Sequence, residues 1–144
     1  EVDYKSQMAA SELVIYNNMS RSNQLSYLIN AQTAMDMAVT RFPNMSQTDS
    51  KADAFRHAYF SLLNVKSLGL TLATNLGNAH ETKNNQSALA KSMDLFNNDV
   101  GRNAFIDYPV EAPYWSIYAD IAYGLITNGN LRYINNGQLT PTNQ

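Results

Sequence analysis

The side chains that could carry out chemistry gather in the middle of the sequence, between residues 53 and 102. Both histidines of the chain, His57 and His80, lie in this stretch beside several carboxylates, and the chain contains no cysteine. The absence of cysteine excludes thiolate nucleophiles, redox pairs and every zinc site with a sulfur ligand. Metal binding or proton transfer must therefore depend on imidazole and oxygen groups.

The spacing of these residues places them on helical faces. Asp53 and His57 are four residues apart and so share one face of a helix. Asp94 and Asn98 repeat that interval further along, and His80 ends a stripe of small residues between them. Because buried ionisable groups are costly unless they are paired or bind something, we expect three neighbouring helices to bring these polar stripes together.

The predicted site has a catalytic set and a binding set. The catalytic set is His57, His80, Glu81 and Asp94, and the binding set is Asp53, Arg56, Asn97, Asn98 and Arg102. Two chemical versions of a hydrolase remain open for these residues, one that depends on a metal ion and one that does not.

In the metal-dependent version, one divalent ion is held by His57, His80 and Asp94, with Glu81 or Asn98 as a further oxygen ligand or base. Mixed imidazole and carboxylate ligands suit zinc, manganese or iron better than calcium, and zinc or manganese is the expected ion. In the metal-free version, His57 activates water as a general base, and an arginine stabilises the negative charge that develops. The sequence leaves both versions open.

No established catalytic motif supports either version. His80 and Glu81 begin like the helix of a zinc protease, but Asn84 stands where that motif has its second histidine. The sequence contains neither a GxSxG nucleophile motif nor a phosphate-binding loop. The identity of any substrate is therefore open.

The same pattern also fits a non-catalytic protein. The polar residues could form a buried network of ion pairs and hydrogen bonds, and the chain would then be a binding or structural module. In that case exposed aromatic rings of the last third of the chain would make the contacts. Tyr114 and Tyr118 fit the core stripe of a helix better than a surface. Trp115 is therefore the ring that distinguishes the two functions, because an exposed indole favours a binding module and a buried one favours a core role.

Hydrophobic periodicity predicts six amphipathic helices and hence one compact, mainly α-helical domain. The expected helices span residues 6–16, 23–42, 50–68, 70–81, 87–105 and 113–126. Ser50 and Asp53 resemble a capping box at the start of the third, and Pro113 suits the first turn of the last. Segments 131–134 and 138–140 flank Asn136-Gly137, which indicates a small terminal β-hairpin or an irregular tail.

Length and charge limit the remaining possibilities. The 144 residues suffice for a single domain over 1–144, whose motif-bearing core is about 49–106. Ten basic against twelve acidic residues argue against nucleic acid as a partner. No apolar run approaches the ~18 residues that a membrane span needs. Because the chain begins at Glu1 rather than methionine, we expect that a preceding segment has been removed.

Four short segments together carry a resemblance to a known family. They are DAFRHAYF (53–60), GNAHE (77–81), MDLFNN (93–98) and GR (101–102). This ordered set resembles a bacterial domain family of unknown function that occurs in secreted, wall-associated and polymorphic-toxin proteins. The family pattern has histidine where this chain has Phe96, which removes one imidazole.

The resemblance implies a cellular context but no reaction. It implies a bacterial protein that is exported to the periplasm, the cell surface or the exterior. A toxin-linked chain would have an immunity or carrier protein as its partner.

Overall fold

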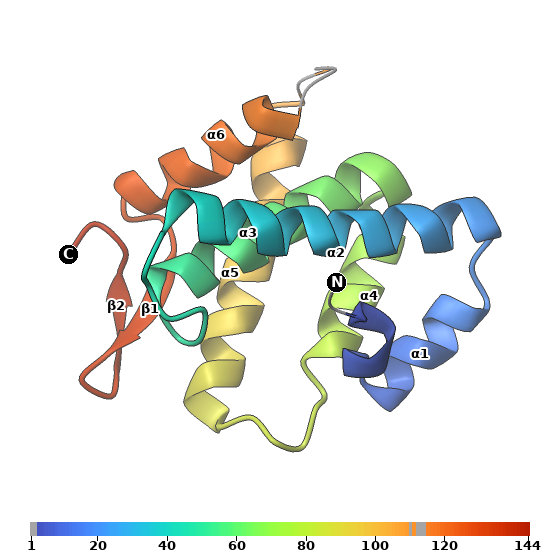
Figure 1. Cartoon of the computed structure of the whole chain (residues 1–144), viewed down its shortest axis with the longest axis horizontal. Helices are drawn as coiled ribbons and strands as arrows, with labels where there is room; N and C mark the ends of the chain where they lie inside the picture. Colours follow the sequence, from blue (N-terminus) through green and yellow to red (C-terminus); the bar gives the residue numbers. More distant parts are fainter. Residues whose placement is uncertain (1–2, 110, 112–114) are drawn as a thin grey trace.

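The computed structural model describes residues 3–109, 111 and 115–144, which form six α-helices, one 3₁₀ helix and a two-stranded sheet (Figure 1). The 3₁₀ helix η1 is Tyr4–Gln7, and the α-helices are α1 Ala10–Asn17, α2 Arg21–Arg41, α3 Lys51–Leu68, α4 Leu70–His80, α5 Ala88–Asp107 and α6 Trp115–Thr127. The strands are β1 Arg132–Asn135 and β2 Gln138–Pro141. The predicted mainly α-helical domain with a terminal hairpin is confirmed.

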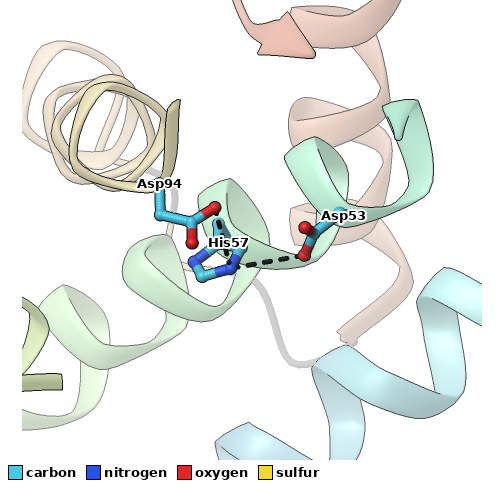
Figure 2. Close-up of side chains that lie close together, drawn as sticks. All are labelled: Asp53, His57 and Asp94. Atoms are coloured by element: carbon cyan, nitrogen blue, oxygen red, sulfur yellow. Dashed lines mark ion pairs between the residues drawn. The ribbon is translucent and has the colours of Figure 1, made fainter. Parts of the chain in front are cut away.

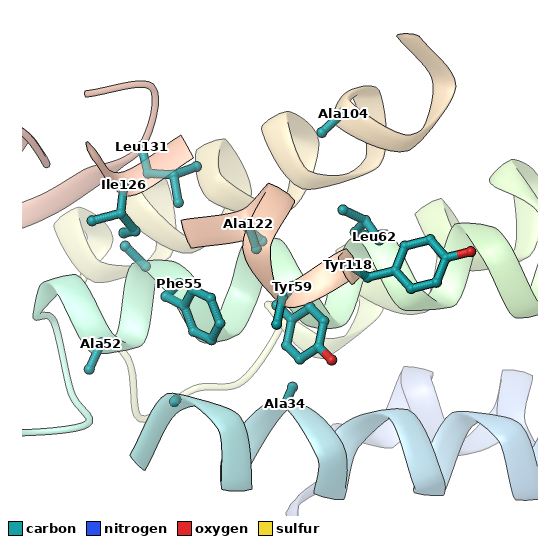
Figure 3. Close-up of a cluster of buried hydrophobic side chains, with 14 of the residues drawn as sticks. Ala34, Ala52, Phe55, Tyr59, Leu62, Ala104, Tyr118, Ala122, Ile126 and Leu131 are labelled. Atoms are coloured by element: carbon teal, nitrogen blue, oxygen red, sulfur yellow. The ribbon is translucent and has the colours of Figure 1, made fainter. Parts of the chain in front are cut away.

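Helix α3 lies at the centre of the molecule and is covered on both faces. Its large apolar side chains Phe55, Tyr59 and Leu62 are completely buried, in a core shared with α2, α5 and α6 (Figure 3). Alanines on the facing helices, such as Ala34 and Ala122, let these helices approach closely. Asp53 of this helix is buried and the side chain of His57 is only 12% exposed, so both residues need partners inside the protein.

Helices α3 and α5 pass very close to one another at Gly101. A Cβ atom added to Gly101 would lie 2.2 Å from the carbonyl oxygen of Ala58, so only glycine fits there. This contact explains why the GR segment needs its glycine. It also brings the polar stripe of α5, which carries Asp94 and Asn98, against the polar stripe of α3.

The start of α3 is held by two side chains. Ser50 is the N-cap residue, and its hydroxyl accepts a hydrogen bond from the backbone N–H of Asp53. Asp53 in turn accepts from the N–H of Asp49 through Oδ2, at 2.8 Å, one residue before the position that a capping box would use. The second oxygen of Asp53 pairs instead with Arg56 and His57 of its own helix.

The terminal hairpin fastens the loop that precedes α3. Its turn residues Asn136 and Gly137 both have positive φ, 51° and 77°, as the tight hairpin turn favoured by Asn-Gly requires. Asn97 of α5 exchanges two hydrogen bonds with the backbone of Arg132, at 2.8 and 2.9 Å. The N–H of Ile134 then donates to the carbonyl of Asp49 at 2.9 Å. The hairpin thereby ties α5 to the loop before α3.

The N-terminal segment differs from the single helix expected over residues 6–16. It forms η1, then an extended stretch through Met8 and Ala9, and only then α1. The break arises because Glu12 accepts a hydrogen bond from the Ala9 N–H at 3.0 Å, while Tyr4 folds back to reach the same carboxylate. Pro113, where the last helix was expected to begin, and Tyr114 lie outside the described residues.

No helix among the described residues is both long enough and apolar enough to cross a membrane.

Candidate functional site

The imidazole of His57 lies between two carboxylates that come from different helices (Figure 2). Its Nε2 atom is 3.3 Å from an oxygen of Asp53, one turn earlier on α3, and 3.3 Å from an oxygen of Asp94 on α5. Its Nδ1 atom is 3.1 Å from the side-chain oxygen of Asn98, which also accepts from Ser61. Both ring nitrogens are therefore fixed, and the predicted convergence of α3 and α5 is present.

The charges of this cluster influence each other strongly. Burial alone lowers the pKa of His57, but the carboxylates of Asp94 and Asp53 outweigh it and raise the pKa to about 9. Burial likewise opposes ionisation of Asp53, yet His57 and Arg56 hold the pKa of that carboxyl well below its usual range. Burial, together with the carboxylates of Asp53 and Glu81, raises the pKa of Asp94. The cluster thus retains a proton on His57 at neutral pH unless another cation replaces it.

Three of these residues have the arrangement of metal ligands. One ligand atom each from Asp53, His57 and Asp94 lies within 4.8 Å of the others. Among the described residues, the Oδ1 atom of Asp94 is buried without a hydrogen-bond partner, and the Nε2 atom of His57 lies 3.3 Å from it as an ion pair. A buried carboxylate oxygen in that state is costly, and a bound cation removes the cost.

The cluster lies at the wall of an open polar cleft of about 420 Å³. The cleft is bordered by η1, the loop before α3, the loop 81–87 and the facing sides of α3 and α5. Its charged lining residues are Asp49, Asp53, Arg56, His57, His80, Glu81, Lys83 and Asp94. Six of the nine predicted site residues thus line one cleft, including all four of the predicted catalytic set.

His80 reaches the cleft but belongs to a different cluster from His57. Its Nδ1 atom is 2.6 Å from a carboxylate oxygen of Glu12, which is completely buried. The metal-ligand arrangement among the described residues has Asp53 where we expected His80. Glu81 is also buried and accepts a hydrogen bond from Gln86, which donates to Asp94 as well.

The remaining predicted residues do not line this cleft. Asn98 orients His57, and Asn97 holds the hairpin as described above. Arg102 is buried with its guanidinium beside Gly77 and 3.7 Å from Asp99. Asn97 of the predicted binding set thus has a structural contact with the hairpin, while Asn98 touches the candidate site directly.

Two aromatic residues that the sequence analysis singled out, Phe96 and Trp115, do not line the cleft. The ring of Phe96 is 40% exposed, and the guanidinium of Arg132 lies 4.9 Å from its centroid. The histidine missing from the family pattern would therefore occupy the surface of α5 beside the hairpin. Trp115 is 44% exposed at the start of α6, whereas Tyr118 is buried in the core.

The sequence interpretation missed Glu12, Tyr4, Tyr27 and Lys83. Glu12 lies four residues before the buried Tyr16, on a stripe that periodicity assigns to the core, and this acid on an apolar face was the available signal. Tyr4 and Lys83 come from a 3₁₀ turn and a loop, whose positions no periodicity predicts.

Fold and site together define a small helical domain with a buried histidine and carboxylate cluster that opens into a polar cleft. The chain belongs to the family described as a domain of unknown function, DUF6973, whose model matches residues 17–127. Neither a curated protein nor a solved structure matches the chain significantly.

Proposed function

We propose that the chain is a metal-dependent hydrolase that binds one zinc or manganese ion at Asp53, His57 and Asp94. One observation carries the proposal. The Nε2 atom of His57 faces both carboxylates, while Asn98 engages its Nδ1 atom, as the outer partner of a metal-bound histidine does.

The chemistry of the three groups supports this ion. One imidazole and two carboxylates give a ligand set that suits zinc or manganese, and three protein ligands leave positions for water and substrate. A divalent ion in such a site would lower the pKa of bound water and so ease the loss of its proton to a base. The adjoining cleft gives a substrate access to that position.

The competing explanation is a self-sufficient ion-pair cluster in which protonated His57 neutralises the two aspartates. The two explanations predict different results for a variant in which Asp94 is replaced by a neutral residue. Loss of a metal ligand abolishes ion binding, whereas loss of an ion pair destabilises a protein that never bound the ion.

The experiment is a calorimetric titration of the purified full chain, first treated with a chelator, with Zn²⁺ and separately with Mn²⁺. We expect one ion per chain for the wild type and a loss of affinity on the order of 100-fold or more in Asp94→Asn. Asp99→Asn is the matched control, because Asp99 lies on the same helix with its side chain largely exposed. Failure of the wild type to bind either ion, or equal affinity in Asp94→Asn, contradicts the proposal.

The hydrolase part is tested with chromogenic substrates. Bis(p-nitrophenyl) phosphate and p-nitrophenyl acetate represent phosphoester and carboxylic ester bonds. We expect the ion-loaded wild type to release p-nitrophenol from one of them and both chelator treatment and Asp94→Asn to stop the release. Release that persists in Asp94→Asn after chelation would show that the ion is not the catalyst.

We also propose that the chain acts outside the cytoplasm of a bacterium, as part of an exported or toxin-linked protein. The motif resemblance supports this context. Expression in a bacterial host with and without an export signal tests it, and we expect growth arrest that depends on compartment and is absent in Asp94→Asn. Equal growth in every case contradicts a toxic role.

One observation favours a second function, a non-catalytic binding module. The exposed indole of Trp115 is the feature that separated the two functions at the level of sequence. Quenching of tryptophan fluorescence by soluble peptidoglycan fragments, absent in Trp115→Ala, would support this module, and it requires neither the ion nor the cleft.

A further inference from the structure

A second polar cluster, formed by Glu12, His80, Tyr4 and Tyr27, lies beside the proposed metal site. The Glu12 carboxylate is completely buried and receives four hydrogen bonds, from Tyr27 at 2.5 Å, His80 at 2.6 Å, the Ala9 N–H at 3.0 Å and Tyr4 at 3.2 Å. Although burial opposes ionisation, His80, Tyr27 and the Ala9 N–H lower the pKa of Glu12. The carboxylate is therefore ionised at neutral pH and acts only as an acceptor.

This arrangement fixes which ring nitrogen of His80 carries the proton. Because Glu12 only accepts, Nδ1 of His80 must be the N–H donor. On the opposite side of the ring, the ammonium of Lys83 lies 3.2 Å from Nε2 and donates to it. Both neighbours thus select the tautomer in which Nε2 keeps its lone pair.

The Nε2 atom of His80 is on the side of the ring that faces Lys83, and both residues line the cleft. The side chain of His80 is 17% exposed and lines the same cleft as His57 and Asp94. Lys83, its partner there, lies in the loop 81–87 rather than on a helix, so water can replace the ammonium without unfolding an element. A histidine that only held α4 against α1 would have no need of an accessible nitrogen.

We infer that His80 is the general acid and base of the cleft and that Glu12, which the sequence did not single out, is its positioning residue. The inference rests on the proposed hydrolase function. In this scheme the two clusters have different roles. The cluster on α3 and α5 binds the ion, and His80 of α4, oriented by Glu12 of α1, transfers the proton.

The step balances as an ordinary hydrolysis. The oxygen of a water molecule bonds to the electrophilic centre of the substrate while one proton of that water passes to Nε2 of His80. The imidazolium returns this proton to the leaving group as its bond to the centre breaks. Glu12 stays ionised throughout and stabilises the imidazolium.

The tautomer is measured on chelator-treated protein, so the result does not depend on ion binding. We expect the ¹⁵N chemical shifts of the neutral ring of wild-type His80 to show N–H at Nδ1 and a lone pair at Nε2, and Glu12→Gln to lose this preference. A proton on Nε2 of the wild-type neutral ring overturns the inference, even if Glu12→Gln does not fold.

The catalytic role is measured on the ion-loaded protein with whichever chromogenic substrate it hydrolyses. We expect His80→Gln to lower kcat by about 10²–10⁴-fold, and Glu12→Gln to lower it with little change in KM, while both retain the ion affinity of the wild type. Asp99→Asn is again the control.

The outcomes distinguish the two proposals. Undiminished kcat in His80→Gln overturns the inference about His80 and leaves the metal-dependent hydrolase intact. Absence of ion binding overturns the proposed function. It also overturns the proposed catalytic role of His80, even if the measured tautomer is the expected one. Loss of ion affinity in His80→Gln would mean that His80 is a ligand, and this also contradicts the different roles of the two clusters.

Discussion

At the scale of single residues, Asn98 determines how the imidazole of His57 can be used. Its side-chain oxygen can only accept, so the Nδ1 atom of His57 carries a proton whether Nε2 is protonated or bound to an ion. The same orientation therefore serves the ion-pair form and the metal-bound form. Exchange between them requires only that a cation replace the proton on Nε2.

This role of Asn98 gives a prediction about affinity. We expect Asn98→Ala to weaken Zn²⁺ or Mn²⁺ binding by about 10–100-fold, because the outer partner of a metal-bound histidine is lost while every ligand remains. Asn103→Ala is the control, since Asn103 is exposed on the same helix. The measurement is the calorimetric titration described above, and equal affinities of the two variants would show that Asn98 has no such role.

Phe96 offers a second prediction at this scale. Its exposed ring lies beside Arg132, outside the cleft, so the departure from the family pattern removes no ligand from the cluster. We expect Phe96→His to leave the stoichiometry and affinity of ion binding unchanged. A clear gain in affinity in the same titration would show that the position does belong to the site.

At the scale of elements, the close contact of α3 and α5 is the feature that aligns the two polar stripes. We expect Gly101→Ala to destabilise the protein by about 1–3 kcal/mol or more, because the new methyl group collides with the backbone at Ala58. Gly124→Ala on α6 is the matched control, since nothing lies within 4 Å of its added Cβ and alanine is the better helix former. Urea unfolding measures both, and a neutral Gly101→Ala would mean that the helices separate at no cost.

The elements also show what the sequence could predict. Hydrophobic periodicity predicted α2 to α5 closely, because each has a long apolar stripe and an end marked by a capping residue, glycine or proline. It missed the break before α1, where a buried carboxylate rather than apolar spacing directs the backbone. The same limitation applies to the site. His57 and Asp94 follow from helical spacing, whereas the contact of His80 with Glu12 joins residues 68 positions apart.

At the scale of the whole molecule, the ionisable groups divide into two sets with opposite effects on stability. Glu12 and Asp53 have lowered pKa values, so each contributes stability that is present above its unfolded pKa and lost as the pH falls. His57, with its pKa raised to about 9, contributes stability that is fully present below the unfolded pKa of about 6.5 and is lost as the pH rises through 9. Asp94, also raised, acts in the same direction as His57.

The sum of these effects predicts a bell-shaped dependence of the unfolding free energy on pH. For chelator-treated protein, we expect the maximum at about pH 5 and a decline below pH 4 as Glu12 and Asp53 become protonated. Above the maximum we expect a decline as Asp94 and then His57 lose their protons, which ends at about pH 9. Urea unfolding at a series of pH values measures the curve. His57→Gln should remove most of the alkaline decline and leave the acid decline in place.

Adding the ion should raise the alkaline side of this curve more than the acid side. A bound cation takes over the charge that the His57 proton supplied, and its affinity rises with pH because the ion no longer competes with that proton. We therefore expect saturating Zn²⁺ or Mn²⁺ to raise the unfolding free energy more at pH 8 than at pH 6, and to have no effect in Asp94→Asn. An ion-pair cluster without a metal role predicts the same curve with and without the ion, so this comparison tests the proposed function on the stability of the whole protein without any knowledge of the substrate.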